Sequence, residues 1–533
     1  MLKETLRKNK GITLIALVVT IIILLILAGI SISMLTGENG IITRTQEAKE
    51  KMKKSQAEEL TSLGKLEEEM LKQQDDGFDT TKGVNRPELL TGMTRIMYEE
   101  PTSDKDGNNL ANGKTIKNGE TGWSDNWYDY KSQKWANTMT QDGSMWVWIP
   151  RYAYKINSDK SMEVKFLVGT TNQWYNTETK QKEDLPEGYK VHPCFQNGKN
   201  TGYKNGEWDS ELRGIWVSKF EAGLPDESSA PKTTSVAKMS NSYYPVFQGQ
   251  KISYNYVDTS MCYSLSKSLI EAGNPYGLSS DADSHLIKNS EWGAVAYLSY
   301  SKYGKTGGTY NTTKEVKINN ATYSDYNKES TINSVRKNGA YAITGYTANV
   351  ANASQNTLTA KELKDTVTGS NGISHAWYTF KGTEGSTTGN IYGIYDMSGG
   401  LAEYTASYIK MASNETLLGY LRNWGYAFVF KDMDKNEFAG NTKYFTEYPE
   451  YEKEGLKTAL ETLGRYGNGY SETWGWFGDW TNNDASGPFT TRGAHWYNTS
   501  EAGVFAFDDD YGYGYGSYSI LRFPLGACCG VAF

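Results

Sequence analysis

A tyrosine- and glycine-rich run near the C-terminus, residues 508–519, lies between two apolar segments. Upstream, Val504–Phe507 has the short apolar pattern of a strand that enters a core. Downstream come Leu521, Arg522 and Phe523. The run itself contains only Asp, Tyr, Gly and Ser, a combination that supplies rigid rings and adaptable hydrogen bonding in antibody paratopes. The alternative is a low-complexity tail, but the apolar flanks favour a binding surface on a folded scaffold.

The residues around this run resemble a known family. Arg492–Trp496 (RGAHW), Val504–Phe507 and Leu521-Arg522 are similar to the end of the C-type lectin fold of formylglycine-generating enzymes, and in particular to ligand-binding proteins diversified by retroelements. In those proteins, adenine-specific copying changes asparagine-type codons into codons for Asp, Tyr, Gly, Ser, His, Thr and Ile. The resemblance implies a variable strip over residues 497–519. Its expected ligand-contacting residues are Tyr497, Asn498, Asp508, Asp509, Asp510, Tyr511, Tyr513, Tyr515, Ser517 and Tyr518.

Two earlier segments predict strands of the same domain. Met145–Tyr152 and Gly214–Glu221 are short runs of aromatic and β-branched residues, which favour the extended conformation. Both resemble early strands of the lectin-like family. Lys219 and Glu221 could form a catalytic pair, but we favour solvent-facing partners on one strand face.

Residues 284–298 predict a helix, whose start Asn289 or Ser290 can cap. Glu291-Trp292 matches a glutamate–tryptophan pair in a helix of the family, where its role is structural. His285 could be a ligand or a base. However, the chain has four histidines in all, and none is spaced for a metal, so no metal or catalytic role is assigned to it.

Asn390–Tyr404 (NIYGIYDMSGGLAEY) resembles the most specific motif of the family, GLYDMAGNVWEW. Gly400 stands where the family has Asn, and Ala402 and Tyr404 replace its two tryptophans. In some relatives this turn helps to bind calcium. A calcium site therefore stays open but weak, because calcium needs six to eight oxygen ligands that the sequence does not supply. No other cofactor is expected.

Residues 407–490 are rich in Trp, Gly, Asn and Tyr, and include Trp474–Trp480 (WGWFGDW). Aromatic residues at this density either fill a loop-rich core or form a platform for a ligand. We take the core as the default.

The N-terminus combines basic residues with a long apolar segment. Ile12–Met34 is uncharged and exceeds the ~20 residues that cross a bilayer. A signal peptide is the alternative, but its apolar region spans only about 7–15 residues and precedes the cleavage site. The basic flank predicts a cytoplasmic N-terminus and an exported remainder. The residues of that flank are Lys3, Arg7, Lys8 and Lys10.

Lys10–Ile15 resembles the leader of type IV prepilins. The resemblance implies cleavage after Gly11 and methylation of Ile12. Ala16 stands where pilins carry a glutamate that takes part in assembly. Assembly with pilin-like subunits therefore stays open, whereas membrane anchoring through residues 12–34 is expected.

These observations predict an α+β protein: a pilin-like transmembrane helix followed by a large C-type lectin-like domain with many short strands and long loops. The expected organisation is a leader over 1–11, a transmembrane and stalk helix over 12–75, a polar linker over 76–143 and the ligand-binding domain over 144–533.

The chemistry of the chain argues against catalysis. The formylglycine-generating family needs a thiol pair just after its RGGSW motif, but Arg492–Trp496 is followed by Tyr497 and Asn498. Cys528 and Cys529 are adjacent and, on this interpretation, lie beyond the last core strand. The chain also lacks a convincing set of iron ligands. No catalytic residue is therefore predicted.

A formal net charge of −7 gives a nucleic-acid partner no electrostatic support. We predict an adhesin-like protein at the cell surface that binds an unknown protein or carbohydrate without catalysis. A minor pilin or pseudopilin subunit is the alternative. An oxidase like the formylglycine-generating enzymes is disfavoured.

Overall fold

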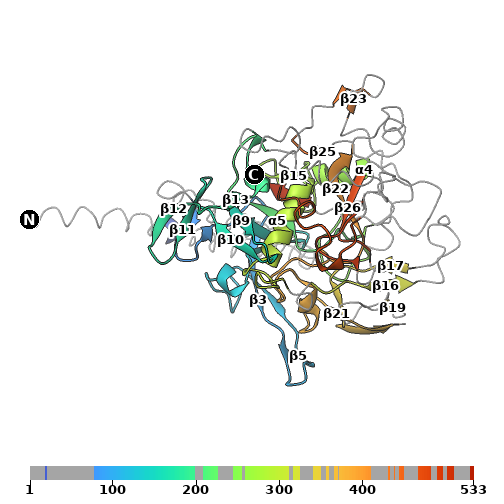
Figure 1. Ribbon diagram of the computed structural model, residues 1–533. Coiled ribbons are helices and arrows are strands. Elements are labelled where there is room, and N and C mark those ends of the chain that lie inside the picture. Colours follow the sequence, from blue (N-terminus) through green and yellow to red (C-terminus); the bar gives the residue numbers. More distant parts are fainter. Residues whose placement is uncertain are drawn as a thin grey trace, which may run out of the picture. The chain divides into compact units, whose positions relative to one another are not determined.

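The computed structural model describes the folded body of the chain (Figure 1). The chain divides into two compact units, Met1–Leu60 and Thr61–Phe533. In the first, only Val18–Thr20 are described, and they are helical. In the second, the described residues are 77–198, 208–225, 244–254, 259–310, 316–324, 340–349, 356–358, 365–369, 371–409, 430–432, 437–438, 443–448, 466–481, 489–495, 501–508 and 529–532.

Strands dominate the described residues, so the predicted α+β class is wrong. Within these ranges, the α-helical residues are Val18–Thr20, Gly198, α4 (Thr259–Ser268) and α5 (Asn289–Tyr300). Short 3-10 turns occur as η1 (Tyr130–Ser132), η2 (Pro193–Phe195), η6 (Gly382–Gly385) and η8 (Trp476–Gly478). The physical reason is the sequence texture: short aromatic and β-branched runs separated by Gly and Asn turns pair as sheets rather than coil as helices.

The largest sheet has seven strands in the order β15-β28-β14-β8-β7-β3-β6. Its second strand comes from the extreme C-terminus, which pairs antiparallel with both of its neighbours. The sheet thus joins residues from nearly the whole length of the body. Its strands are β3 (Thr94–Glu99), β6 (Lys114–Lys117), β7 (Asn137–Met139), β8 (Met145–Pro150), β14 (Gly214–Ser218), β15 (Asp283–Leu286) and β28 (Cys529–Ala532).

This sheet contradicts two of the predictions made from the sequence. The expected polar linker over 76–143 is wrong, because β3, β6 and β7 are strands of the main sheet and pair with β8 through β7. Trp127, Tyr128 and Trp135 in the same segment are buried in the core. Cys529 does not follow the last core strand either, since it begins β28 inside the sheet.

A second sheet of four strands has the order β25-β22-β26-β27. Its strands are β22 (Glu403–Ile409), β25 (Thr446–Tyr448), β26 (Phe489–Arg492) and β27 (Phe507–Asp508). The three-stranded sheets are β10-β9-β13, β17-β16-β19 and β18-β21-β20. Their strands are β9 (Tyr152–Ile156), β10 (Met162–Phe166), β13 (Lys190–Val191), β16 (Ala321–Ser324), β17 (Ala340–Ala342), β18 (Tyr346–Ala348), β19 (Asn356–Leu358), β20 (Thr366–Gly369) and β21 (Gly372–Ala376).

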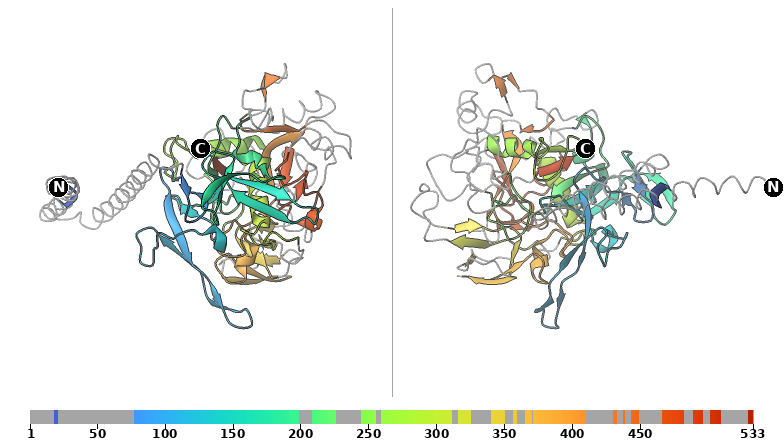
Figure 2. Two further views of the ribbon diagram at one scale, coloured as in Figure 1. Left: turned by 60° about the vertical axis from the view of Figure 1, so that its left-hand side comes forward. Right: turned by 180° about the vertical axis from the view of Figure 1, so that it is seen from behind.

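Four two-stranded pairs complete the β structure: β1-β2, β4-β5, β11-β12 and β23-β24. Their bounds are β1 (Phe78–Asp79), β2 (Val84–Asn85), β4 (Thr102–Ser103), β5 (Asn109–Ala111), β11 (Gln173–Asn176), β12 (Gln181–Asp184), β23 (Phe430–Asp432) and β24 (Glu437–Phe438). The β4–β5 hairpin projects away from the main sheet in both views of Figure 2. Leu110 at this hairpin is 68% exposed.

The core is aromatic and surrounds α5. Trp146, Trp148 and Trp216 lie on neighbouring strands and are fully buried, as is Trp292 on the helix. The helix is buried on nearly all sides, so a single apolar face does not describe it. The predicted helix within 284–298 is confirmed as α5, although its N-cap is Lys288 rather than Asn289 or Ser290.

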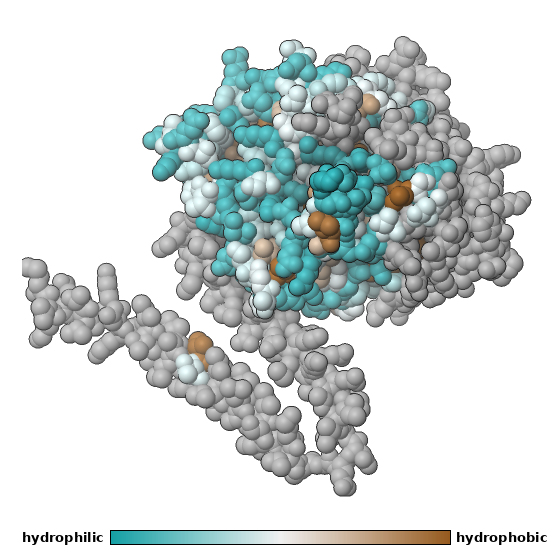
Figure 3. Space-filling model, turned by 90° about the horizontal axis from the view of Figure 1, so that it is seen from below, coloured by the Kyte–Doolittle hydropathy of each residue, from teal (hydrophilic) through white to brown (hydrophobic). Residues whose placement is uncertain are grey.

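The predicted strands at 145–152 and 214–221 are confirmed as β8 with β9, and as β14, which ends earlier at Ser218. The face drawn in Figure 3 is mostly hydrophilic, with apolar residues scattered singly, as is normal for a folded protein.

The predicted leader at Gly11 and Ile12 and the expected stalk helix lie outside the described residues, and only Val18–Thr20 of the apolar segment 12–34 is described. Within the described ranges, helices are too short or too polar to cross a bilayer.

Candidate functional site

The candidate site is formed by β26, β27 and the turn that precedes β27. We call this region the base of the C-terminal strip. Strand β27 pairs antiparallel with β26, with Thr491 opposite Asp508 and Arg492 opposite Phe507. Phe507 also forms a parallel bridge with Thr481. The predicted strand at 504–507 is therefore wrong in extent, because Val504 and Phe505 lie in a turn and pairing begins only at Phe507.

Arg492 fastens this base. Its side chain is fully buried, and its Nε atom donates to the carbonyl oxygen of Ala506 at 2.7 Å. The two Nη atoms donate to the carbonyl oxygens of Asn468 and Gly469, each at 2.7 Å. Burial lowers the pKa of Arg492 to about 10, at which the guanidinium stays protonated at neutral pH. The arginine of the RGAHW motif thus joins its own strand, β26, to two other chain segments through their carbonyl groups.

Asp479 fixes the turn that precedes β27. Its Oδ2 atom accepts a hydrogen bond from the backbone N–H of Phe505 at 2.8 Å. A Cβ atom at Gly503 would collide with the Asp479 carboxylate, so the turn needs glycine there. The N–H of Trp480 donates to the carbonyl oxygen of Glu501 at 2.7 Å. Residues 501–507 are consequently held against 479–481 by backbone contacts.

Four of the segments that resemble the lectin-like family meet at this base: 284–298, 390–404, 492–496 and 504–507. The Trp292 indole donates to the carbonyl oxygen of Val504 at 2.8 Å. The N–H of Gly399, in the motif turn, donates to the carbonyl oxygen of Gly493 at 3.0 Å. The Glu291 carboxylate accepts from the N–H of Lys288 at 2.8 Å and lies 2.9 Å from His285 Nε2. His285 and Glu291 are therefore a buried pair that is joined by a hydrogen bond.

The motif turn centres on Asp396, whose φ of 63° lies in the left-handed region. Its carboxylate accepts hydrogen bonds from the N–H of Gly345 at 2.9 Å and from Asn319 Nδ2 at 2.9 Å. Burial raises the pKa of Asp396 to about 7, although these hydrogen bonds act in the opposite direction. These bonds from two separate segments explain how the strained conformation persists.

Lys219 and Glu221 are fully buried, so the predicted solvent-facing pair is wrong. Lys219 Nζ donates to the carbonyl oxygens of Ile391 at 2.7 Å and Gly393 at 2.8 Å. Glu221 accepts from the Ser253 hydroxyl and from the N–H of Leu401 at 3.0 Å. Each side chain thus holds a different part of the motif segment, and neither is arranged as a catalytic pair with the other.

Three buried carboxyl groups, Glu221, Asp396 and Glu403, interact near the motif turn. Burial and the other two charges raise the pKa of Glu221 well above its usual value. Gly400 matters here, because a Cβ atom at this position would lie 2.9 Å from Glu221 Oε1. Among the described residues, no group of three or more His, Cys, Asp or Glu is arranged to hold a metal ion. The weak calcium expectation stays a prediction.

Of the ten predicted contact residues, Asp508 alone is described. It is 6% exposed; Trp480 Nε1 donates to its Oδ2 at 3.2 Å, and the Thr491 hydroxyl donates to its carbonyl oxygen at 3.3 Å. In this arrangement Asp508 belongs to the base of the strip. The other nine lie outside the described residues: Tyr497, Asn498, Asp509, Asp510, Tyr511, Tyr513, Tyr515, Ser517 and Tyr518.

The aromatic residues of segment 474–480 differ in burial, which bears on whether they fill the core or form a platform for a ligand. Trp476 is 5% exposed and packs against Tyr300, Tyr310 and Phe505. Trp474 and Trp480 are half-buried. The core role is therefore confirmed for Trp476.

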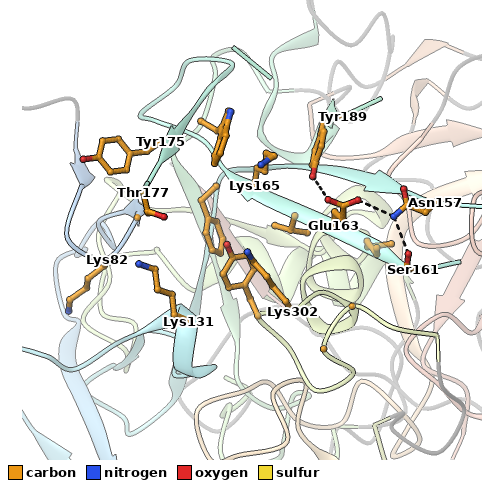
Figure 4. A pocket seen from close by; sticks show the side chains of 18 residues that line it. Lys82, Lys131, Asn157, Ser161, Glu163, Lys165, Tyr175, Thr177, Tyr189 and Lys302 are labelled. Atoms are coloured by element: carbon orange, nitrogen blue, oxygen red, sulfur yellow. Dashed lines mark hydrogen bonds between the residues drawn. The ribbon is translucent and has the colours of Figure 1, made fainter. Parts of the chain in front are cut away.

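Sequence reasoning missed a cavity beside β10 and β11. The cavity has a volume of about 680 Å³ and is lined by residues of β10, β11 and the loop around 302–308. Figure 4 shows its lysine and tyrosine side chains. The signal in the sequence was the alternation of Glu163 and Lys165 with apolar residues, followed by Trp174-Tyr175. Neither protein-family models nor curated proteins match this chain.

Proposed function

We propose that this protein binds ligands without catalysis, through a contact surface built from residues 497–519. The tyrosines of the strip supply apolar area with a hydroxyl group, and its aspartates supply acceptors for polar or basic partners. The ligand class is a protein or a carbohydrate. Display at the cell surface stays a prediction from residues 3–34.

One observation carries the proposal: both ends of the segment 509–528 are fastened to sheets. It follows β27, which is paired with β26, and it precedes β28, which is paired with both β14 and β15. A low-complexity tail would have a free end. Chain anchored at both ends by strands is the usual setting of binding loops, because a rigid scaffold carries them.

The buried base supports the same proposal. The hydrogen bonds of Arg492, Trp292 and Asp479 use backbone groups of 504–506, which precede the segment 509–519 in the chain. Substitutions over residues 509–519 would leave these hydrogen bonds intact, because the bonds involve no residue of that segment. A scaffold of this kind tolerates a variable surface.

The first test reads the gene. The codons for residues 497–519 are compared with any near-copy in the flanking DNA. Differences confined to template adenines support a diversified binding surface. Differences spread over all four bases, or the lack of a copy, would refute active diversification.

The second test asks whether the tyrosines are contact residues or core residues. The variant Tyr511→Ser/Tyr513→Ser/Tyr515→Ser/Tyr518→Ser should unfold in urea with a free energy within about 0.5 kcal/mol per substitution of the wild type. A loss of several kcal/mol would assign the tyrosines to the core and contradict a contact role.

The third test asks whether the strip confers binding. A display library that varies residues 509–518 among Tyr, Ser, Asp, Asn and Gly is selected on hen egg-white lysozyme. A matched library varies residues 104–108 of the exposed β4–β5 hairpin. The proposal expects binders from the strip library at higher frequency. Equal frequencies from both libraries would count against it.

A further inference from the structure

The cavity beside β10 and β11 is a second candidate site, separate from the C-terminal strip. Residues that line it come from 82–83, 131, 157–189 and 302–308, so it contains no residue of the strip. Its volume of about 680 Å³ falls in the range of small-molecule sites.

Lysine side chains give the cavity a positive charge. Lys82, Lys131, Lys165 and Lys302 line it, against one carboxylate, Glu163. None of these four lysines forms an ion pair with a carboxylate of the described residues within 4.0 Å. Burial lowers the pKa of Lys165, and the nearby charge of Lys302 lowers it further, whereas the charges of Glu163 and Glu183 act in the opposite direction. An anion in the cavity would relieve this repulsion.

Aromatic rings form the apolar part of the wall. Trp174, Tyr175 and Tyr189 are half-buried and line the cavity. Lys165 Nζ lies 3.4 Å from the centroid of a Trp174 ring and 5.3 Å from that of Tyr189. These cation–π contacts hold the ammonium group between the rings. The wall thus presents ring faces and positive charge side by side.

Side chains that can form hydrogen bonds with the hydroxyl groups of a ligand lie at one end of the cavity. In the view of Figure 4, Glu163 lies with Tyr189 and Asn157 at the end away from Lys82 and Lys131. The Tyr189 hydroxyl donates to Glu163 Oε2 at 2.6 Å, and Asn157 Nδ2 donates to Oε1 at 3.1 Å. These hydrogen bonds lower the pKa of Glu163, so it is ionised at neutral pH and accepts from hydroxyl groups.

We propose that this cavity binds an acidic oligosaccharide, a short chain of sugar rings that carry carboxylate groups. The aromatic faces suit the C–H faces of sugar rings, the lysines suit the carboxylates, and Glu163 and Asn157 suit ring hydroxyls. Single-stranded DNA fits less well, because its sugar–phosphate backbone has no free hydroxyl groups within the chain that could donate to Glu163.

The test uses the full-length protein and isothermal titration calorimetry. The probes are trigalacturonic acid, its fully methyl-esterified form and the oligonucleotide dT10. The acid should bind at least about tenfold more tightly than the ester, because only the acid can pair with several lysines. Its affinity should fall as salt concentration rises.

Variants connect binding to the cavity. Lys302→Met should weaken binding of the acid about threefold, and Lys165→Met/Lys302→Met about tenfold, at the energies typical of exposed ion pairs. Lys105→Met is the matched control, since Lys105 is 89% exposed on the β4–β5 hairpin, and it should bind as the wild type does. Thermal unfolding checks that each variant folds.

Three outcomes would overturn the proposal. Equal affinity for acid and ester would show that charge does not direct binding. Unchanged affinity in the folded double variant would place the binding elsewhere. Tighter binding of dT10 than of trigalacturonic acid would assign the cavity to nucleic acid. Failure of this test leaves the function proposed for the strip untouched, because strip variants retain the cavity.

Discussion

The indole nitrogen of Trp292, in α5, lies 2.8 Å from the carbonyl oxygen of Val504 and donates a hydrogen bond to it. Trp292 is fully buried, and Val504 is 2% exposed. This bond connects α5, which is buried on nearly all sides, with the turn that leads into β27. The resemblance to the lectin-like family implied a structural role for this tryptophan.

Trp292→Phe should destabilise the protein by roughly 1–3 kcal/mol, because it leaves the Val504 carbonyl without its donor and opens space beside it. Urea unfolding of the wild type and the variant measures the change. Trp123→Phe is the control: Trp123 is partly exposed and its indole is 3.4 Å from Asp125, so we expect a change below about 0.5 kcal/mol. Equal losses in the two variants would contradict a special role for the Trp292 bond.

Arg492→Met should cost roughly 3–5 kcal/mol. The substitution retains the apolar stem but removes the donors to Ala506, Asn468 and Gly469, which leaves buried carbonyl groups unsatisfied. Thermal unfolding measures the loss, with Arg95→Met, at a partly exposed position, as the control. A melting temperature close to that of the wild type would mean that the guanidinium does not fasten the base of the strip.

Gly400→Ala tests the close approach of Glu221. At this position φ is +68°, and a Cβ atom would lie 2.9 Å from Glu221 Oε1. Gly273→Ala is the matched control, because its φ of +85° imposes a similar backbone strain while its Cβ would meet nothing within 4 Å. Gly400→Ala should therefore lose roughly 1–3 kcal/mol more than Gly273→Ala in urea unfolding. Equal losses would show that backbone strain alone explains the glycine.

Asp396→Asn tests the raised pKa of that carboxyl group. The folded pKa of about 7 exceeds the unfolded value of 3.8, so the folded state holds a proton that the unfolded state releases. The stability that this group contributes is present below pH 4 and is lost as the pH rises to 7. The stability difference, wild type minus variant, should decrease from pH 4 to pH 7.

The difference is measured because other groups act in the opposite direction. Burial lowers the pKa of His192 to about 3 and that of His375 to about 4, and each contributes stability that is lost as the pH falls. Both histidines are present in wild type and variant, so they cancel. A difference that is constant with pH would contradict the raised pKa of Asp396.

Local sequence determined the helices and strands whose own residues favour that conformation, independently of distant parts of the chain. The strand at Met145–Pro150 and the helix at Asn289–Tyr300 follow from their own runs of aromatic, β-branched and helix-forming residues. The resemblance also identified Trp292, Asp396 and Arg492, and the structure brings their segments together at one base. Whether the strip binds ligands stays a prediction, because nine of its ten contact residues lie outside the described ranges.

Tertiary structure decided what depends on distant partners. The segment 76–143 reads as a linker because its residues are polar, but β3 and β7 gain their hydrogen bonds from each other and from β8. The four residues of β28 have no pattern of their own that would predict a place between β14 and β15. Lys219 is buried because Ile391 and Gly393 supply carbonyl oxygens from far along the chain. Sequence periodicity reports only on neighbours in the chain, whereas sheet pairing and the burial of charge depend on residues that meet only after folding.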